Sequence, residues 1–318
     1  MNTYELIRSV VYGHAIADAL GVPVEFTSRS SLQRTPVTGM RGYGTHDMPA
    51  GTWSDDTSMA LATMDSLTHG IDYEDPMRRF CEWTENDAYT ATGEMFDIGI
   101  TTSDALHRYL AGTPALQCGR HGDRDNGNGA LMRIYPVVLY CCVLHPDEYD
   151  TAAMIELIHN YSALTHAHPR SMVGCGIYTF VLRALLSGDT IHNALSDARS
   201  FYEASEFSHE LQHYGRIFDE DFRNTPVDEI ESGGYVVSSL EATIWCLMNS
   251  KSYSECVLTA VNLGRDTDTT AAITGSLAGA MFGLESIPSE WMDTLLNREL
   301  IEDVLLLFLP SFPCTAFG

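Results

Sequence analysis

The stretch 271–283 reads AAITGSLAGAMFG and spaces small residues four apart, at Ala271, Gly275, Gly279 and Gly283. Residues with this spacing share one face of an α-helix, and small side chains let a neighbouring helix approach closely. The stretch is shorter than the ~20 uninterrupted apolar residues that a membrane span requires. It therefore predicts a tightly packed central helix in a soluble chain.

Apolar residues recur with helical spacing through much of the chain, for example at Leu6, Val10, Ala17 and Leu20. Long alternations typical of strands are hard to find, and Gly and Pro residues separate the helical stripes. The sequence predicts an all-α fold, a compact orthogonal multi-helix bundle. One domain over residues 1–318 is the favoured organisation.

Composition limits the possible partners of the chain. The 318 residues include 45% hydrophobic and 19% charged residues, and 43 acidic against 18 basic residues give a formal net charge of −25. Such a surface repels phosphate backbones and anionic lipids, so we expect neither nonspecific nucleic-acid binding nor membrane binding. An anionic ligand would need backbone N–H groups, helix N-termini or cations.

The N-terminal segment and the cysteines indicate a cytoplasmic location. Residues 1–21 include Glu5, Arg8, His14 and Asp18, so they lack the uninterrupted apolar core of a signal peptide. The eight cysteines form no CxxC motif or zinc-type spacing. We expect reduced, mostly buried thiols.

The segment GTWSDDTSM, residues 51–59, is typical of a helix start. Ser54 is a candidate N-cap, and Asp55 and Asp56 would lie in the first turn. Capping and the helix dipole alone would account for Ser54 and one aspartate. Taken alone, the motif therefore does not establish a functional site.

A second acidic helix start, NLGRDTDTT, precedes the small-residue stretch. Asp266 and Asp268 alternate in what we interpret as an extended lead-in, so both would point the same way, and Thr269 would add a hydroxyl. Capping requires only one of these residues. Two such segments indicate a site for hard divalent cations, where Mg²⁺ or Ca²⁺ fits better than zinc.

Three motifs together, GHAIADALGVPVEF, SDDTSM and RDTDTTAAITGSLAGAMFG, resemble the ADP-ribosylglycohydrolase family. The resemblance covers most of the chain. It implies an all-α fold with a binuclear centre of two divalent cations, Mg²⁺ or Mn²⁺, which Ca²⁺ can replace in a crystal. The ligands that the resemblance implies are Ser54, Asp55 and Asp56 in one group, and Asp266, Asp268 and Thr269 in the other.

The resemblance also implies two catalytic candidates, Glu25 in VPVEF and Asp97 in MFDIGITTSDAL. A glutamate in a loop is otherwise commonly exposed, and Asp97 could equally be a helix-entry residue. Gly99 is a substrate-binding candidate because glycine lets a ligand approach backbone N–H groups at a helix start.

Several further residues match family positions around ADP-ribose. The glycines of the loop in DNGNGALMRIYPV expose N–H donors for a diphosphate. Without the resemblance, His166 and Tyr235 would be interpreted as structural residues. Arg133, which follows this loop, is interpreted as a structural residue paired with an acid. The substrate-binding candidates are Asn126, Gly127, Asn128, Gly129, His166, Gly234 and Tyr235.

Some positions depart from the family pattern. Ala17 stands where glycine is common, Ser54 where threonine is common, and Arg265 where a small or acidic residue is frequent. Serine at position 54 keeps the hydroxyl ligand. Arg265 leaves the identity of the leaving group open. We interpret the acidic stretch 218–234 as a solvated surface insertion.

The resemblance implies hydrolysis that releases ADP-ribose from an ADP-ribosylated protein or another ADP-ribose conjugate. The FDIG segment favours an N-glycosidic bond to arginine, because Asp97 can contact a cationic leaving group. Hydrolysis of O-linked or small-molecule conjugates stays open. So do a two-metal phosphohydrolase and a binding protein that sequesters ADP-ribosylated targets or neutralises a toxin.

Overall fold

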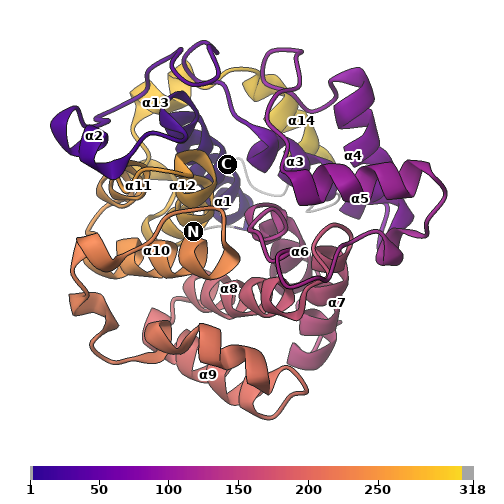
Figure 1. Ribbon diagram of the computed structural model, residues 1–318. Helices are drawn as coiled ribbons and strands as arrows, with labels where there is room; N and C mark the ends of the chain where they lie inside the picture. The colour runs from indigo at the N-terminus through magenta and orange to yellow at the C-terminus, as the bar shows by residue number, and fades with distance from the viewer. Residues whose placement is uncertain (1–2, 310–318) are drawn as a thin grey trace, which may run out of the picture.

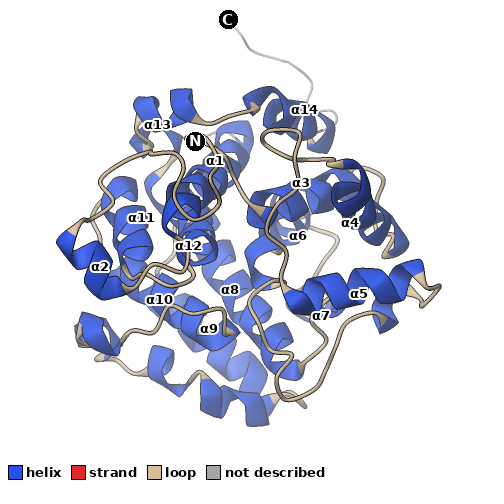
Figure 2. Cartoon of the chain, turned by 45° about the horizontal axis from the view of Figure 1, so that its top comes forward, coloured by secondary structure: helices blue, strands red, loops and turns tan. Residues whose placement is uncertain are grey.

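The computed structural model describes residues 3–309, and this part of the chain contains helices and no named strands (Figures 1 and 2). The predicted all-α fold is therefore confirmed. The α-helices are α1 (Thr3–Gly21), α2 (Arg29–Arg34), α3 (Asp55–Leu67), α4 (Glu74–Asn86), α5 (Ile100–Leu110), α6 (Tyr135–Leu139), α7 (Thr151–Ala163), α8 (Pro169–Ser187), α9 (Ile191–Glu203), α10 (Val236–Asn249), α11 (Tyr253–Asn262), α12 (Thr267–Phe282), α13 (Ser289–Thr294) and α14 (Arg298–Phe308).

The centre of the fold is the pair α1 and α12, which lie against each other along their length. An added Cβ on Gly275 would overlap the carbonyl oxygen of Gly13, and one on Gly279 would overlap that of Ser9. Small residues on both helices therefore allow backbone-to-backbone packing. The predicted central helix is confirmed, and its partner is the first helix of the chain.

Gly283 does not belong to the small-residue face of α12. It lies just beyond the helix with a φ of 81°, and its N–H bonds to the Gly279 carbonyl oxygen. Glycine adopts this left-handed conformation without strain, which is why it ends the helix. The interpretation of Gly283 as a fourth packing position was wrong.

The remaining helices surround this pair. α8, α10 and α11 pack against α12, and α3 packs against α1. Figure 1 shows α3, α4 and α5 on one side of the molecule and α10 and α11 on the other. The N-termini of α3 and α12, far apart in sequence, are consequently brought to the middle of the fold.

The acidic stretch 218–234 is less solvated than predicted. It forms short 3₁₀ turns, and Phe222 and Ile230 are buried. The Arg29 guanidinium donates to the carbonyl oxygens of Val227, at 2.5 Å, and Ile230. Packing against α2 therefore anchors much of this stretch.

The part of the chain that the structure describes has no membrane-spanning helix, and its cysteines form no disulfide. Among residues 3–309, no helix combines the length and apolar character needed to cross a membrane. The described cysteines are all free, and all but Cys142 are buried. Cys314 lies outside the described residues.

Candidate active site

The start of α3 is fixed by hydrogen bonds from within and from α1. The Ser54 side chain accepts from the Asp56 N–H, so the predicted N-cap is confirmed. The buried Asp18 carboxylate on α1 accepts from the N–H of Ser54, at 3.0 Å, and from the N–H and hydroxyl of Thr57, at 3.1 and 2.6 Å. Asp18 therefore holds the first turn of α3 in place.

The start of α12 differs from the predicted extended lead-in. Asp266 is the N-cap residue, and Asp268 already lies in the first helical turn. A Cβ on Gly21 would overlap the backbone of Asp268, so the end of α1 touches the start of α12. Helical geometry, rather than strand alternation, sets the directions of the two carboxylates.

The acids of the two helix starts meet in the interior. The Thr269 hydroxyl donates to Asp56 Oδ2 at 3.2 Å, although 213 positions separate them. One carboxylate oxygen from each of Asp18, Asp56 and Asp268 lies within 4.8 Å of the others. Two segments from opposite ends of the chain thus form a single acidic cluster.

Burial of these carboxylates is electrostatically unfavourable. The pKa values of Asp55, Asp56 and Asp268 are raised well above the ordinary value, first by burial and then by neighbouring carboxylates. Asp56 Oδ1 and Asp268 Oδ2 are buried without a hydrogen-bond partner among residues 3–309. Divalent cations would satisfy these oxygens and offset the repulsion, so the donor set fits hard metal ions.

Glu25 and Asp97 lie beside this cluster and share a histidine. His46 Nε2 makes a short contact with Glu25 Oε2 and lies 4.0 Å from Asp97 Oδ2. Burial raises the pKa of Glu25 to about 7, against the opposing effect of its bond to His46. Glu25, His46, Asp97 and Asp268 offer ligand atoms within 4.8 Å of one another.

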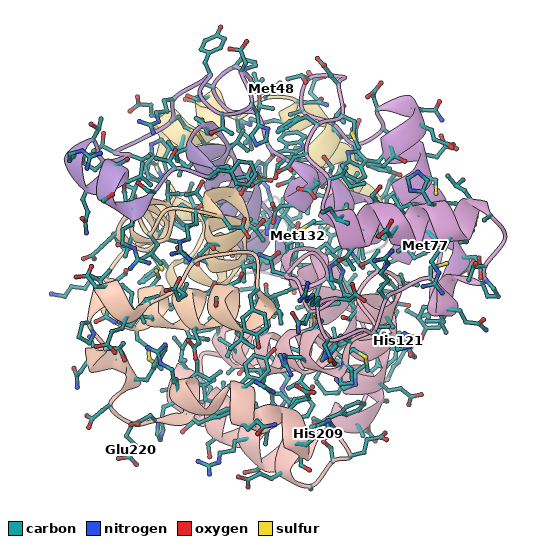
Figure 3. All side chains as sticks on the ribbon, in the orientation of Figure 1. Met48, Met77, His121, Met132, His209 and Glu220 are labelled. Carbon is teal, nitrogen blue, oxygen red and sulfur yellow. The ribbon has the colours of Figure 1, made fainter. Side chains whose placement is uncertain are left out.

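A cavity of about 650 Å³ opens above these residues. Its volume falls in the usual range for small-molecule sites. Met132, labelled near the centre of Figure 3, is one of the lining residues. The predicted site residues that line the cavity are Glu25, Asp55, Asp97, Gly99, Gly127, Asn128, Gly129, His166, Gly234, Asp266 and Thr269.

The glycine-rich loop forms one wall of the cavity. Asn128 donates its side-chain N–H groups to Asp266 Oδ2, at 2.8 Å, and to Ser239, at 2.9 Å. A Cβ on Gly129 would lie 2.8 Å from Cε1 of His166, so glycine leaves room for the imidazole. The loop is thereby tied both to the start of α12 and to His166.

Five predicted residues do not line the cavity. Ser54, Asp56 and Asp268 are buried. Asp56 accepts hydrogen bonds from the hydroxyls of Ser54 and of Thr269, a lining residue, so Ser54 and Asp56 lie beneath the cavity wall. Asn126 turns its side chain to the Asp123 carbonyl oxygen. Tyr235 bridges to Gly127 through the backbone, and its ring lies 5.9 Å from the Arg170 guanidinium.

Sequence reasoning missed Asp18 and His46. A carboxylate within the apolar stripe of α1 was a signal for Asp18, because buried acids are rare unless they have partners. His46 lies in an irregular loop, where no periodicity indicates its direction. Its place beside Glu25 and Asp97 depends on the tertiary structure.

The comparisons with known proteins match the chain to one family. A family model described as ADP-ribosylglycohydrolase matches residues 1–312. The chain is 32% identical over 302 residues to the ADP-ribosylarginine hydrolase Tri1 of Serratia proteamaculans, which covers 93% of this chain and 77% of that protein. It is 29% identical over 307 residues to the ADP-ribosyl-[dinitrogen reductase] glycohydrolase of Rhodospirillum rubrum, with 92% of each chain covered.

A solved structure shows the same fold. The ADP-ribosylglycohydrolase-related protein complex superposes with a TM-score of 0.79 at 31% identity, covering 96% of this chain and 97% of that chain. Its coverage is nearly complete in both directions, as is the match of the family model to this chain. On this evidence the chain belongs to the ADP-ribosylglycohydrolase family.

Proposed function

We propose that the protein is a metal-dependent hydrolase that releases ADP-ribose from ADP-ribosylated arginine in proteins. The observation that carries this proposal is the single acidic cluster that Asp56 and Asp268 form beneath a cavity lined by Glu25 and Asp97. The relative named as an ADP-ribosylarginine hydrolase supports the arginine linkage. The packing of α1 on α12 also supports one domain over residues 1–318.

The residues proposed to hold two divalent cations, Mg²⁺ or Mn²⁺, offer carboxylate and hydroxyl oxygens, which these ions prefer. Bound divalent cations supply positive charge that can orient vicinal ribose hydroxyls and polarise a water molecule. The chain contributes the geometry, because Asp18 fixes the start of α3 and Gly21 the start of α12. The proposed ligands are Ser54, Asp55, Asp56, Asp266, Asp268 and Thr269.

Glu25 and Asp97 are proposed to transfer protons and to stabilise positive charge at the anomeric carbon. Glu25 Oε2 and His46 Nε2 are in short contact, so a proton taken up by one of these groups can be shared with the other. Cleavage of a glycosidic bond passes through an oxocarbenium-like transition state, which a nearby carboxylate stabilises. An Asp97 carboxylate can also pair with the guanidinium that leaves.

The cavity wall is proposed to bind the rest of ADP-ribose. Backbone N–H groups at Gly127 and Gly129, together with the start of α5 after Gly99, offer donors for an anionic diphosphate. These donors meet the need of a strongly acidic chain for a local anion site. The target is proposed to be an ADP-ribosylated protein, which the name of the relative that acts on ADP-ribosyl-[dinitrogen reductase] supports.

A panel of conjugates tests the proposal. Purified protein with Mg²⁺ should release ADP-ribose from ADP-ribosyl-arginine, and chelator should abolish this release. Asp268→Asn, which removes a proposed metal ligand, should lower kcat at least about 10-fold, whereas Glu220→Gln, a change at an exposed acid labelled at the edge of Figure 3, should not. Release only from serine-linked conjugates would contradict the arginine linkage, and AMP with ribose phosphate would indicate a phosphohydrolase instead.

A further inference from the structure

Arg133 is a buried cation whose role the proposed chemistry leaves open. Its side chain is fully buried, and no carboxylate among residues 3–309 pairs with it. Nη2 instead donates to the Tyr161 carbonyl oxygen at 3.2 Å and to the Thr165 hydroxyl at 2.7 Å, and the guanidinium lies 4.9 Å from the Phe80 ring. The interpretation of Arg133 as a partner of an acid was wrong.

The Thr165 hydroxyl links Arg133 to His166. Thr165 Oγ1 lies 2.9 Å from His166 Nδ1. A guanidinium only donates hydrogen bonds, so Thr165 Oγ1 accepts from Arg133 and its own proton needs an acceptor. Nδ1 is the acceptor that the described part of the chain offers it. A Thr165 hydroxyl that donates to Nδ1 needs that nitrogen unprotonated, which places the proton of the neutral ring on Nε2.

The other imidazole nitrogen faces the cavity. His166 lines it, and Nε2 lies 3.5 Å from the position that a Cβ on Gly127 would take. Nε2 has no hydrogen-bond partner within residues 3–309 and is not sealed from solvent. The ring is held in place, because the His166 N–H and carbonyl oxygen both bond to Ser162.

We propose that Arg133 and Thr165 are positioning residues that fix His166 as its Nε2–H tautomer, so that a neutral imidazole donates to a diphosphate oxygen of the ligand. This inference rests on the proposed function for the identity of the ligand, ADP-ribose. It explains why Arg133 is buried without an acidic partner: its positive charge lies on the far side of His166 from the cavity, and His166 donates to the anionic diphosphate. Burial, and then the charge of Arg133, lower the pKa of His166 to about 3, in keeping with a neutral ring.

The tautomer can be measured without ligand or turnover. ¹⁵N NMR of wild-type protein should show His166 protonated at Nε2 and unprotonated at Nδ1. Thr165→Val, which removes the hydroxyl, should change this pattern, and Thr165→Ser should restore it. Thr179→Val is the matched control, because Thr179 is buried and its hydroxyl bonds within its own helix, to Cys175.

Binding links the tautomer to the ligand. Calorimetry should show that Thr165→Val binds ADP-ribose about 3–10-fold more weakly than wild type, whereas Thr165→Ser and Thr179→Val bind nearly as well. A wild-type His166 protonated at Nδ1 would overturn the inference, as would equal affinity in Thr165→Val. If the tautomer is as expected but ADP-ribosyl-arginine stays intact, the proposed function fails and the positioning role stands.

Discussion

The Asp18 carboxylate on α1 accepts hydrogen bonds from the Ser54 N–H at 3.0 Å and from the Ser54 hydroxyl at 2.9 Å. Both groups are buried. The same Ser54 hydroxyl has Asp56 Oδ2, at 3.0 Å, as an alternative acceptor. A residue of the first helix thus sets the position of a candidate metal ligand on the third.

Replacement of Asp18 by alanine would leave the N–H groups of Ser54 and Thr57 without an acceptor. We expect Asp18→Ala to lower the free energy of unfolding by about 1–3 kcal/mol, measured by urea denaturation in saturating Mg²⁺. Saturating Mg²⁺ offsets the repulsion between Asp18 and the neighbouring carboxylates, so the removal of the Asp18 charge adds little stability. Glu220→Ala is the control, and equal stability of the two variants would contradict the role of Asp18.

Close packing of α1 on α12 predicts a steric effect at Gly275. A Cβ there would overlap the Gly13 carbonyl oxygen, so Gly275→Ala should destabilise the protein by about 1–3 kcal/mol. Gly215→Ala is the matched control, since nothing lies within 4 Å of a Cβ at that position. Thermal unfolding of both variants measures the difference, and an unchanged Gly275→Ala midpoint would show that the helices lie farther apart.

Asp97 has a φ of 55°, a left-handed conformation that asparagine tolerates well. Asp97→Asn should therefore keep the backbone while removing the charge, and kcat for ADP-ribosyl-arginine should fall about 10²–10⁴-fold. Asp47→Asn makes the same change at an exposed residue with the same φ of 55°. Full activity in Asp97→Asn would exclude Asp97 from the chemistry.

The raised pKa values predict an unusual pH dependence of the metal-free protein. Burial raises the pKa of Glu25 to about 7 and that of Asp18 to about 6, so the folded state holds protons that the unfolded chain releases above about pH 4. Metal-free stability from these groups should therefore decline between about pH 4 and pH 7. Mg²⁺ binds the ionised forms and should oppose the decline.

Urea midpoints with chelator at about pH 5 and pH 7.5 measure this decline. Glu25→Gln should reduce it, and Glu220→Gln, at an exposed position, should leave it unchanged. A metal-free wild-type protein that gains stability between these pH values, with no effect of Glu25→Gln, would contradict the electrostatic account.

Local signals made part of this structure predictable. Ser54 and its two aspartates define a helix start through short-range capping, and the spacing of Gly275 and Gly279 defines a packing face. The matching small positions on α1 include Ser9 and Gly13, whose contact with α12 confirms the close approach. Such features are encoded within a few residues.

Features that depend on tertiary contacts were not predictable in the same way. The direction of Asp268 follows from a helix that begins at Thr267, two residues after Arg265 turns the chain with a φ of 67°. The contact of His46 with Glu25 forms only when the loop that carries His46 folds over Glu25, so no local sequence pattern indicates it. Arg133 looked like half of an ion pair, whereas the fold gives it Thr165 and an aromatic face.

We propose that acids from the two ends of the chain form one binuclear cation site. Mn²⁺ titration calorimetry of wild type, Asp56→Asn, Asp268→Asn and the double variant tests it most directly. Each single variant should lose most of the high-affinity binding, and the double variant should lose little more, because both residues serve the same site. Independent, additive losses, or wild-type affinity in either single variant, would contradict it.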